Sequence, residues 1–212
     1  MPAQIVVPIF PLPDLTFFPH TMLPLHIFEP RYRAMITDCL ARDRRLAVVG
    51  LRPGYEADYE GRPPVFAVTG LGRIVQCERM ASGRYNLVLR GECRARIDRE
   101  LPADTLYRMV AATPLEEQGA ERPAVAALAG QVRSRTARIL AAVGRAGAEL
   151  QQSLDQVSEP GRLCDQIAST LVPSPVTRRA LLEELDVERR LERLSAALDD
   201  LLSHMSEEGG RS

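Results

Sequence analysis

The sequence predicts an α+β protein in which a β-rich first part is followed by a helical second part. Three observations support this. Short apolar or alternating segments separated by turn residues fill the first half, a proline-rich apolar segment opens it, and from Glu121 onward apolar residues recur every three or four positions. We therefore expect a β unit over residues 1–118, a helical unit over 119–205 and a frayed polar tail over 206–212.

Residues 9–33 form the proline-rich segment, which we predict to be neither disordered nor a regular strand or helix. Proline fixes φ, removes a backbone donor and favours extended geometry in the residue before it. The large apolar side chains between the prolines are too many to face water. We expect an extended, kinked ribbon pressed onto a core. Its prolines are Pro11, Pro13, Pro19, Pro24 and Pro30.

The β unit is expected to contain several strands and one inserted helix. Glu29-Pro30 opens the helix, because proline suits the first helical position and an acidic group is favoured beside it. Gly70, Gly72 and Gly91 lie inside strands, where glycine indicates a bulge or sharp bend. Such bends suit a small curled sheet or pseudo-barrel. The expected strands are 23–28, 46–51, 65–80, 84–100 and 106–113.

The second half is expected to hold four helices. The first starts near Glu121, the second spans 161–171, Ser174-Pro175 caps the third, and Asp186 caps the fourth. The fourth helix carries a narrow heptad seam, which packs on the first helix or, alternatively, pairs with another chain as a short coiled coil. The seam consists of Val187, Leu191, Leu194, Leu198, Leu201 and Met205.

Composition excludes several classes of function. The chain has no lysine, which excludes a P-loop ATPase and a Ser-Lys dyad, since arginine stays protonated. Residues 1–146 carry 20 arginines and 15 acids, whereas the remainder carries 7 arginines and 13 acids. This asymmetry reflects either attraction between two subdomains or a basic binding face. Scattered cysteines, no membrane-spanning run and no signal peptide predict a cytoplasmic protein with reduced thiols.

Several motifs resemble the substrate-binding (N-terminal) domain of Lon protease. They are Phe10-Pro11-Leu12, Phe18-Pro19, the run Leu23–Tyr32, Gly70–Ile74, Leu89–Arg94 and Asp186–Leu191. In that family an aromatic residue is commoner after the last arginine of the Leu89–Arg94 motif, where this chain has Ala95. The resemblance implies a PUA-like β pseudo-barrel with one inserted helix, followed by a helical bundle. It also implies a stand-alone member without the ATPase and protease segments.

From this resemblance we expect a non-catalytic module that binds proteins or peptides and acts as an adaptor in proteolysis or protein quality control. Its partners would be polypeptide clients or a protease, and it would be a monomer or weak dimer without membrane contact. We expect no cofactor. We also expect no bound metal, because no third ligand is evident beside His26 and Glu29. His26 is expected to be packed and hydrogen-bonded instead.

Two sets of residues are candidates for binding. An exposed apolar contact surface for peptide could include Phe17, Phe18, Tyr55 and Tyr59, although the two phenylalanines could equally belong to the core. The alternative function is RNA binding by the arginine-rich hairpin, whose period-2 pattern predicts that Arg94 and Arg96 face outward. That patch would consist of Arg84, Arg90, Arg94 and Arg96.

Overall fold

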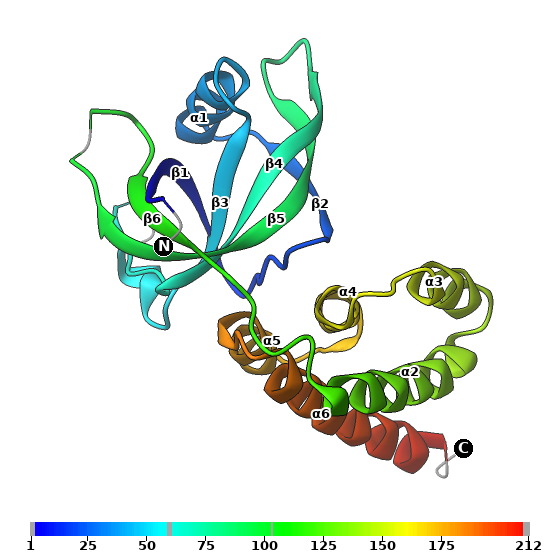
Figure 1. Ribbon diagram of the computed structural model, residues 1–212. Coiled ribbons are helices and arrows are strands. Elements are labelled where there is room, and N and C mark those ends of the chain that lie inside the picture. The colour runs from blue at the N-terminus through cyan, green and yellow to red at the C-terminus, as the bar shows by residue number, and fades with distance from the viewer. Residues whose placement is uncertain (1–2, 59–60, 103, 210–212) are drawn as a thin grey trace. The chain divides into compact units, whose positions relative to one another are not determined.

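The computed structural model describes residues 3–58, 61–102 and 104–209. The chain divides into two compact units, Met1–Glu116 and Glu117–Ser212, close to the predicted boundary after residue 118 (Figure 1). The first unit is a β unit and the second is helical, so the predicted α+β class is confirmed. No helix in the described part of the chain is long and apolar enough to cross a membrane.

The β unit is a six-stranded mixed sheet in the order β2-β5-β4-β3-β1-β6. Strand β5 also pairs with β6, so the sheet curls back on itself (Figure 1). Helix α1 (Pro30–Leu40) and the short 3-10 helix η1 (Tyr55–Asp58) lie between strands. The strands are β1 (Ile5–Leu12), β2 (Met22–Ile27), β3 (Arg45–Gly50), β4 (Val68–Arg79), β5 (Tyr85–Glu100) and β6 (Met109–Leu115).

The start of the proline-rich segment corrects the prediction of an irregular ribbon, because Ile5–Leu12 is the regular strand β1. Its first half pairs with β6 and its second half with β3. Each half therefore has a ladder partner on one side only. This leaves room for Pro8 and Pro11, whose missing N–H groups are tolerated where a backbone edge is unpaired.

The next part of the ribbon crosses directly over the sheet at two glycines. Phe17 and Phe18 are 2% and 0% exposed. A Cβ on Gly70 would overlap the carbonyl oxygen of Phe17, and a Cβ on Gly91 would overlap that of Phe18. The amide of His20 donates to the Gly91 carbonyl at 3.0 Å. Glycine is therefore required here for close backbone approach, in addition to the predicted bulges, which occur as two register shifts between β4 and β5.

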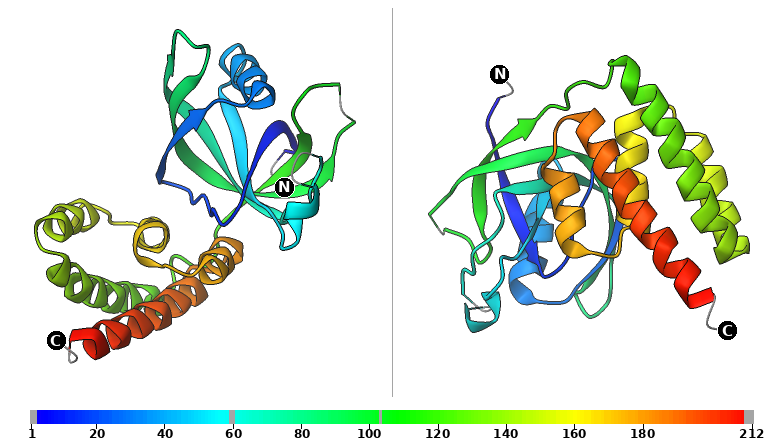
Figure 2. Two further views of the ribbon diagram at one scale, coloured as in Figure 1. Left: turned by 180° about the vertical axis from the view of Figure 1, so that it is seen from behind. Right: turned by 90° about the horizontal axis from the view of Figure 1, so that it is seen from below.

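The helical unit contains five helices in its described residues (Figure 2). Helix α3 was not predicted, because its only buried residues are Gly147 and Leu154, too few for a visible apolar stripe. Helix α6 reaches Gly209, which corrects the predicted tail: Ser206 is helical, and its hydroxyl donates to the Leu202 carbonyl at 2.9 Å. The helices are α2 (Pro123–Val143), α3 (Arg145–Asp155), α4 (Pro160–Leu171), α5 (Pro175–Glu183) and α6 (Val187–Gly209).

The heptad seam of α6 packs inside the helical unit. Helices α2 and α6 run side by side in the same direction (Figures 1 and 2), and an Arg135–Asp199 ion pair of 2.7 Å joins them. The first four seam residues are fully buried, whereas Leu201 and Met205 are partly exposed. Only the last part of the seam is therefore available for a coiled coil with another chain.

The cap of α6 predicts a pH effect. Asp186 accepts hydrogen bonds from the amides of Arg189 and Glu188 and from the guanidinium of Arg122, and the Arg189 amide is the main reason why the pKa of this carboxyl lies below its usual value. Because the folded pKa is lower than the unfolded one, this stabilisation is present above the unfolded pKa and is lost as pH falls through the folded pKa. An Asp186→Asn variant keeps an acceptor oxygen without titrating. Its melting temperature should fall less than that of the wild type between about pH 5 and about pH 3, measured by circular dichroism; equal losses would contradict this role.

Candidate functional site

The outer face of strands β2, β5 and β4 forms an open groove of about 570 Å³. Cross-strand register places side chains in rows across the three strands: Pro24 lies beside Val88, and Val88 beside Gln76. In the same way Asn86 lies between His26 and Glu78. We call this surface the β2–β5–β4 groove, and its lining residues are Pro24, Leu25, His26, Gln76, Cys77, Glu78, Asn86, Leu87 and Val88.

Three large apolar side chains are exposed to solvent two residues along the chain from groove-lining residues; they do not line the groove themselves, and we call them its rim. Met22 is 56% exposed, Phe28 57% and Met80 40%. Alternation along a strand puts Met22 on the same face as Pro24, and Met80 on the same face as Glu78. Exposed apolar side chains gathered beside a depression are typical of interaction surfaces. Residues 22–28 alternate between exposed and less exposed positions in the structure, but their sequence is apolar at nearly every position, so it does not indicate which face of the strand is exposed.

His26 is held at the surface of the groove. Its Nδ1 lies 2.7 Å from Oδ1 of Asn86, and its ring stacks on Phe28 with centroids 6.3 Å apart. Glu29 instead pairs with Arg31 at 3.0 Å. His26 is therefore hydrogen-bonded as expected, but it is exposed rather than packed. Among the described residues no group of three or more His, Cys, Asp or Glu side chains could hold a metal ion.

Strand β2 is the last strand at its side of the sheet. Pro24 stands in the middle of this edge and has no N–H to donate. Proline at an edge hinders the addition of a further strand by an incoming chain. Contact at this surface should therefore be made by side chains in the groove, and not by an unbroken backbone ladder along β2.

The predicted peptide-contacting residues are not brought together. Phe17 and Phe18 are buried, because they fill the space that Gly70 and Gly91 leave open above the sheet, so they cannot form an exposed surface. Tyr55 is half-buried on η1 and does not line the groove. Tyr59 lies outside the described residues.

The predicted arginine patch is also not formed as a set. Arg94 is 1% exposed, contrary to the expectation that it faces outward. Its cross-strand neighbour is Gly70, over which the ribbon passes, so the face of β5 is covered at Arg94. Arg96 is exposed and pairs with Asp98 at 3.2 Å. Arg84 and Arg90 are exposed on β5 or at its start; Arg90 is the cross-strand neighbour of Met22 at the rim of the groove.

The three cysteine thiols of the β unit are poor nucleophiles. Burial raises the pKa of Cys39 to about 12, and burial also raises the pKa of Cys77 and Cys93 above the ordinary value. Cys77 lines the β2–β5–β4 groove. These three groups remain thiols at neutral pH, and they pack as apolar groups in or against the core clusters of the β unit.

Comparison with known proteins gives consistent matches along the chain. The model of the family described as the ATP-dependent protease La (LON) substrate-binding domain matches residues 6–200. Lon protease 2 of Myxococcus xanthus is 27% identical over 187 residues, which is 88% of this chain and 22% of that protein. Lon protease 3 of Sorangium cellulosum is 28% identical over 194 residues, which is 91% of this chain and 23% of that protein.

Solved structures show the same fold. The N-terminal domain of a Lon protease from the Mycobacterium avium complex superposes with a TM-score of 0.73 at 24% identity, and covers 92% of this chain and 99% of that one. A Lon N-terminal domain protein from Xanthomonas campestris gives a TM-score of 0.65 at 24% identity, and covers 91% and 98%. The chain thus matches whole N-terminal domains, but it spans less than a quarter of the length of the curated relatives above.

Proposed function

Because the chain belongs to the family of Lon substrate-binding domains, we propose that it is a non-catalytic polypeptide-binding module and an adaptor in cytoplasmic proteolysis or quality control. The observation that supports this most directly is the β2–β5–β4 groove with its exposed apolar rim. Its partners would be unfolded client segments or a protease that receives them.

The groove offers the chemistry that an extended, apolar client segment needs. Met22, Phe28 and Met80 supply apolar contact area, and methionine adapts its shape to different side chains. Gln76 and Asn86 line the floor and can exchange hydrogen bonds with the backbone of the client. This combination suits binding that tolerates many sequences, since few of its contacts depend on a particular client side chain.

Removing the apolar rim should weaken client binding. In a variant with Phe28→Ser and Met80→Ser, the half-exposed side chains that a client would cover are lost. We expect a loss of about 2 kcal/mol, or about thirtyfold in Kd. The measurement is fluorescence anisotropy with a dye-labelled, reduced and carboxymethylated α-lactalbumin as the permanently unfolded client.

A matched control is Val176→Ser on α5, because Val176 is 79% exposed but lies in the helical unit. This variant should bind the unfolded client like the wild type. If the rim variant and the wild type have the same affinity, or if the control weakens binding equally, the groove is not the client site.

A further inference from the structure

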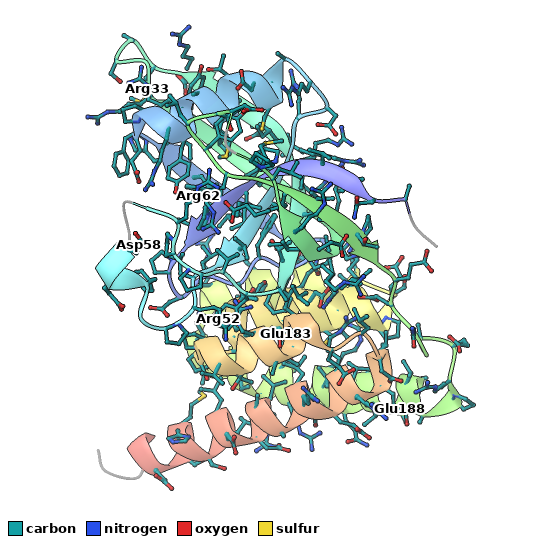
Figure 3. The ribbon with its side chains drawn as sticks, turned by 90° about the vertical axis from the view of Figure 1, so that its left-hand side faces the viewer. Arg33, Arg52, Asp58, Arg62, Glu183 and Glu188 are labelled. Atoms are coloured by element: carbon teal, nitrogen blue, oxygen red, sulfur yellow. The ribbon has the colours of Figure 1, made fainter. Side chains whose placement is uncertain are left out.

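The β unit contains a second cavity of about 290 Å³ that shares no lining residue with the β2–β5–β4 groove. It is enclosed by the end of β1, the first turn of α1, the loop after η1 and the loop that leads into β6. Asp58 shapes the loop after η1, since its side chain accepts from the Arg62 amide at 3.1 Å. Figure 3 shows Arg62 and Asp58 together on this side of the β unit.

Among the described residues that line this cavity, three are arginines from separate segments and none carries a carboxylate: Arg31, Arg62 and Arg108. Glu29 pairs with Arg31, and Glu100 pairs with both Arg62 and Arg108. The charged side chains that line the described wall are therefore all cationic, which favours an anionic guest over a neutral one.

Arg62 is the arginine best placed to bind a guest. Arg108 is 12% exposed and already donates to both oxygens of Glu100 and to the Pro63 carbonyl. Arg62 is 45% exposed, and within the described part of the chain its guanidinium donates only through Nη1, to Glu100 at 3.1 Å. Its remaining N–H groups form the fork that matches a carboxylate.

Beside Tyr32 and Thr105, apolar side chains form much of the remaining wall, and they limit the size of the guest. The apolar lining consists of Pro11, Leu51, Pro63, Leu106 and the ring of Tyr107. The Leu106 residue is 73% exposed to solvent. The Tyr107 hydroxyl donates to Asp38 at 2.6 Å, so the ring offers its apolar body. A volume of about 290 Å³ is at the small end for ligand pockets.

We propose that this cavity binds one carboxylate carried on a compact apolar body. A free small acid and the C-terminal residue of a polypeptide present the same chemistry, and the two differ only in whether a peptide chain is attached to the apolar body. The carboxylate engages Arg62, while the apolar body lies against Leu51 and Leu106.

The test is an NMR titration of the ¹⁵N-labelled full chain with N-acetyl-leucine and with its uncharged primary amide. The acid should bind at least tenfold more tightly than the amide. The Arg62→Gln variant should lose this preference for the acid. The variant should still fold, because Arg108 donates hydrogen bonds to both oxygens of Glu100 without Arg62. Arg52→Gln is the matched control, since Arg52 is an exposed arginine of the same connection that does not line the cavity (Figure 3).

A second pair of probes distinguishes the sources of the carboxylate. These are N-acetylated Gly-Gly-Gly-Leu with a free carboxylate and the same peptide amidated. Binding of the peptide acid assigns the cavity to chain termini, whereas binding of N-acetyl-leucine alone assigns it to small acids. Equal binding of acid and amide, no binding of either acid, or an Arg62→Gln variant that binds like the wild type would each overturn the proposal.

Discussion

Replacing Gly91 with alanine should lower the free energy of unfolding of the β unit by about 3 kcal/mol. The new Cβ would overlap the carbonyl oxygen of Phe18 and lie 3.0 Å from Cα of Pro19. Both obstacles are backbone, and both are fixed by hydrogen bonds from His20 to Gly91 and from Gly91 to Thr21. The ribbon would have to lift from the sheet, which would loosen the packing of Phe17 and Phe18.

Tyrosine fluorescence in a urea titration measures this effect in the β unit alone, because the chain has no tryptophan and its five tyrosines all precede residue 117. The matched control is Gly130→Ala in α2, where a Cβ meets nothing within 4 Å. It should leave the tyrosine transition unchanged and stabilise the helical unit by about 0.5–1 kcal/mol. An unshifted tyrosine midpoint in Gly91→Ala would show that the ribbon can move aside.

Replacing Arg190 with methionine should destabilise the helical unit by about 3–5 kcal/mol. Arg190 is fully buried and joins three segments of this unit. It donates to Glu117 at 2.6 Å and to the Glu184 carbonyl at 3.3 Å, and its Nε lies 3.7 Å from Oδ1 of the equally buried Asp165. The substitution leaves the Asp165 carboxylate inside the protein without this cation.

Urea unfolding followed by far-ultraviolet circular dichroism tests this expectation. The double variant Arg190→Met with Asp165→Leu removes both charges and should recover most of the lost stability, because no unbalanced charge then remains buried. Arg145→Ala is the surface control: Arg145 pairs with Glu149, but both side chains are largely exposed, so stability should change little. A double variant as unstable as the single one would mean that packing, and not charge balance, is the role of Arg190.

The sequence was sufficient for features that depend on neighbours along the chain. Ser174 was predicted as a helix cap, and its Oγ accepts from the Thr177 amide at 3.2 Å. Pro30 begins α1 as expected, and five of the six strands lie within a few residues of their predicted positions. Local periodicity, capping and turn chemistry determine such elements, so they can be predicted without knowledge of the tertiary structure.

The candidate site could be predicted less well. The arginines were expected outside and the phenylalanines at a contact surface, but Arg94, Phe17 and Phe18 are buried. Alternation assigns a residue to one face of a strand, yet it does not tell which face another segment covers. In this chain the ribbon covers the face of β4 and β5 that carries Gly70 and Arg94.

The sequence by itself therefore determined the α+β class, the order of most elements and the family. Only the tertiary structure decided that Met22, Phe28 and Met80 rim one groove and that Arg31, Arg62 and Arg108 line one cavity. The physical reason is that patterns along the chain reflect backbone preferences over a few residues. Burial and convergence depend instead on contacts between segments far apart in sequence, such as β2 with β5 and the ribbon with Gly91.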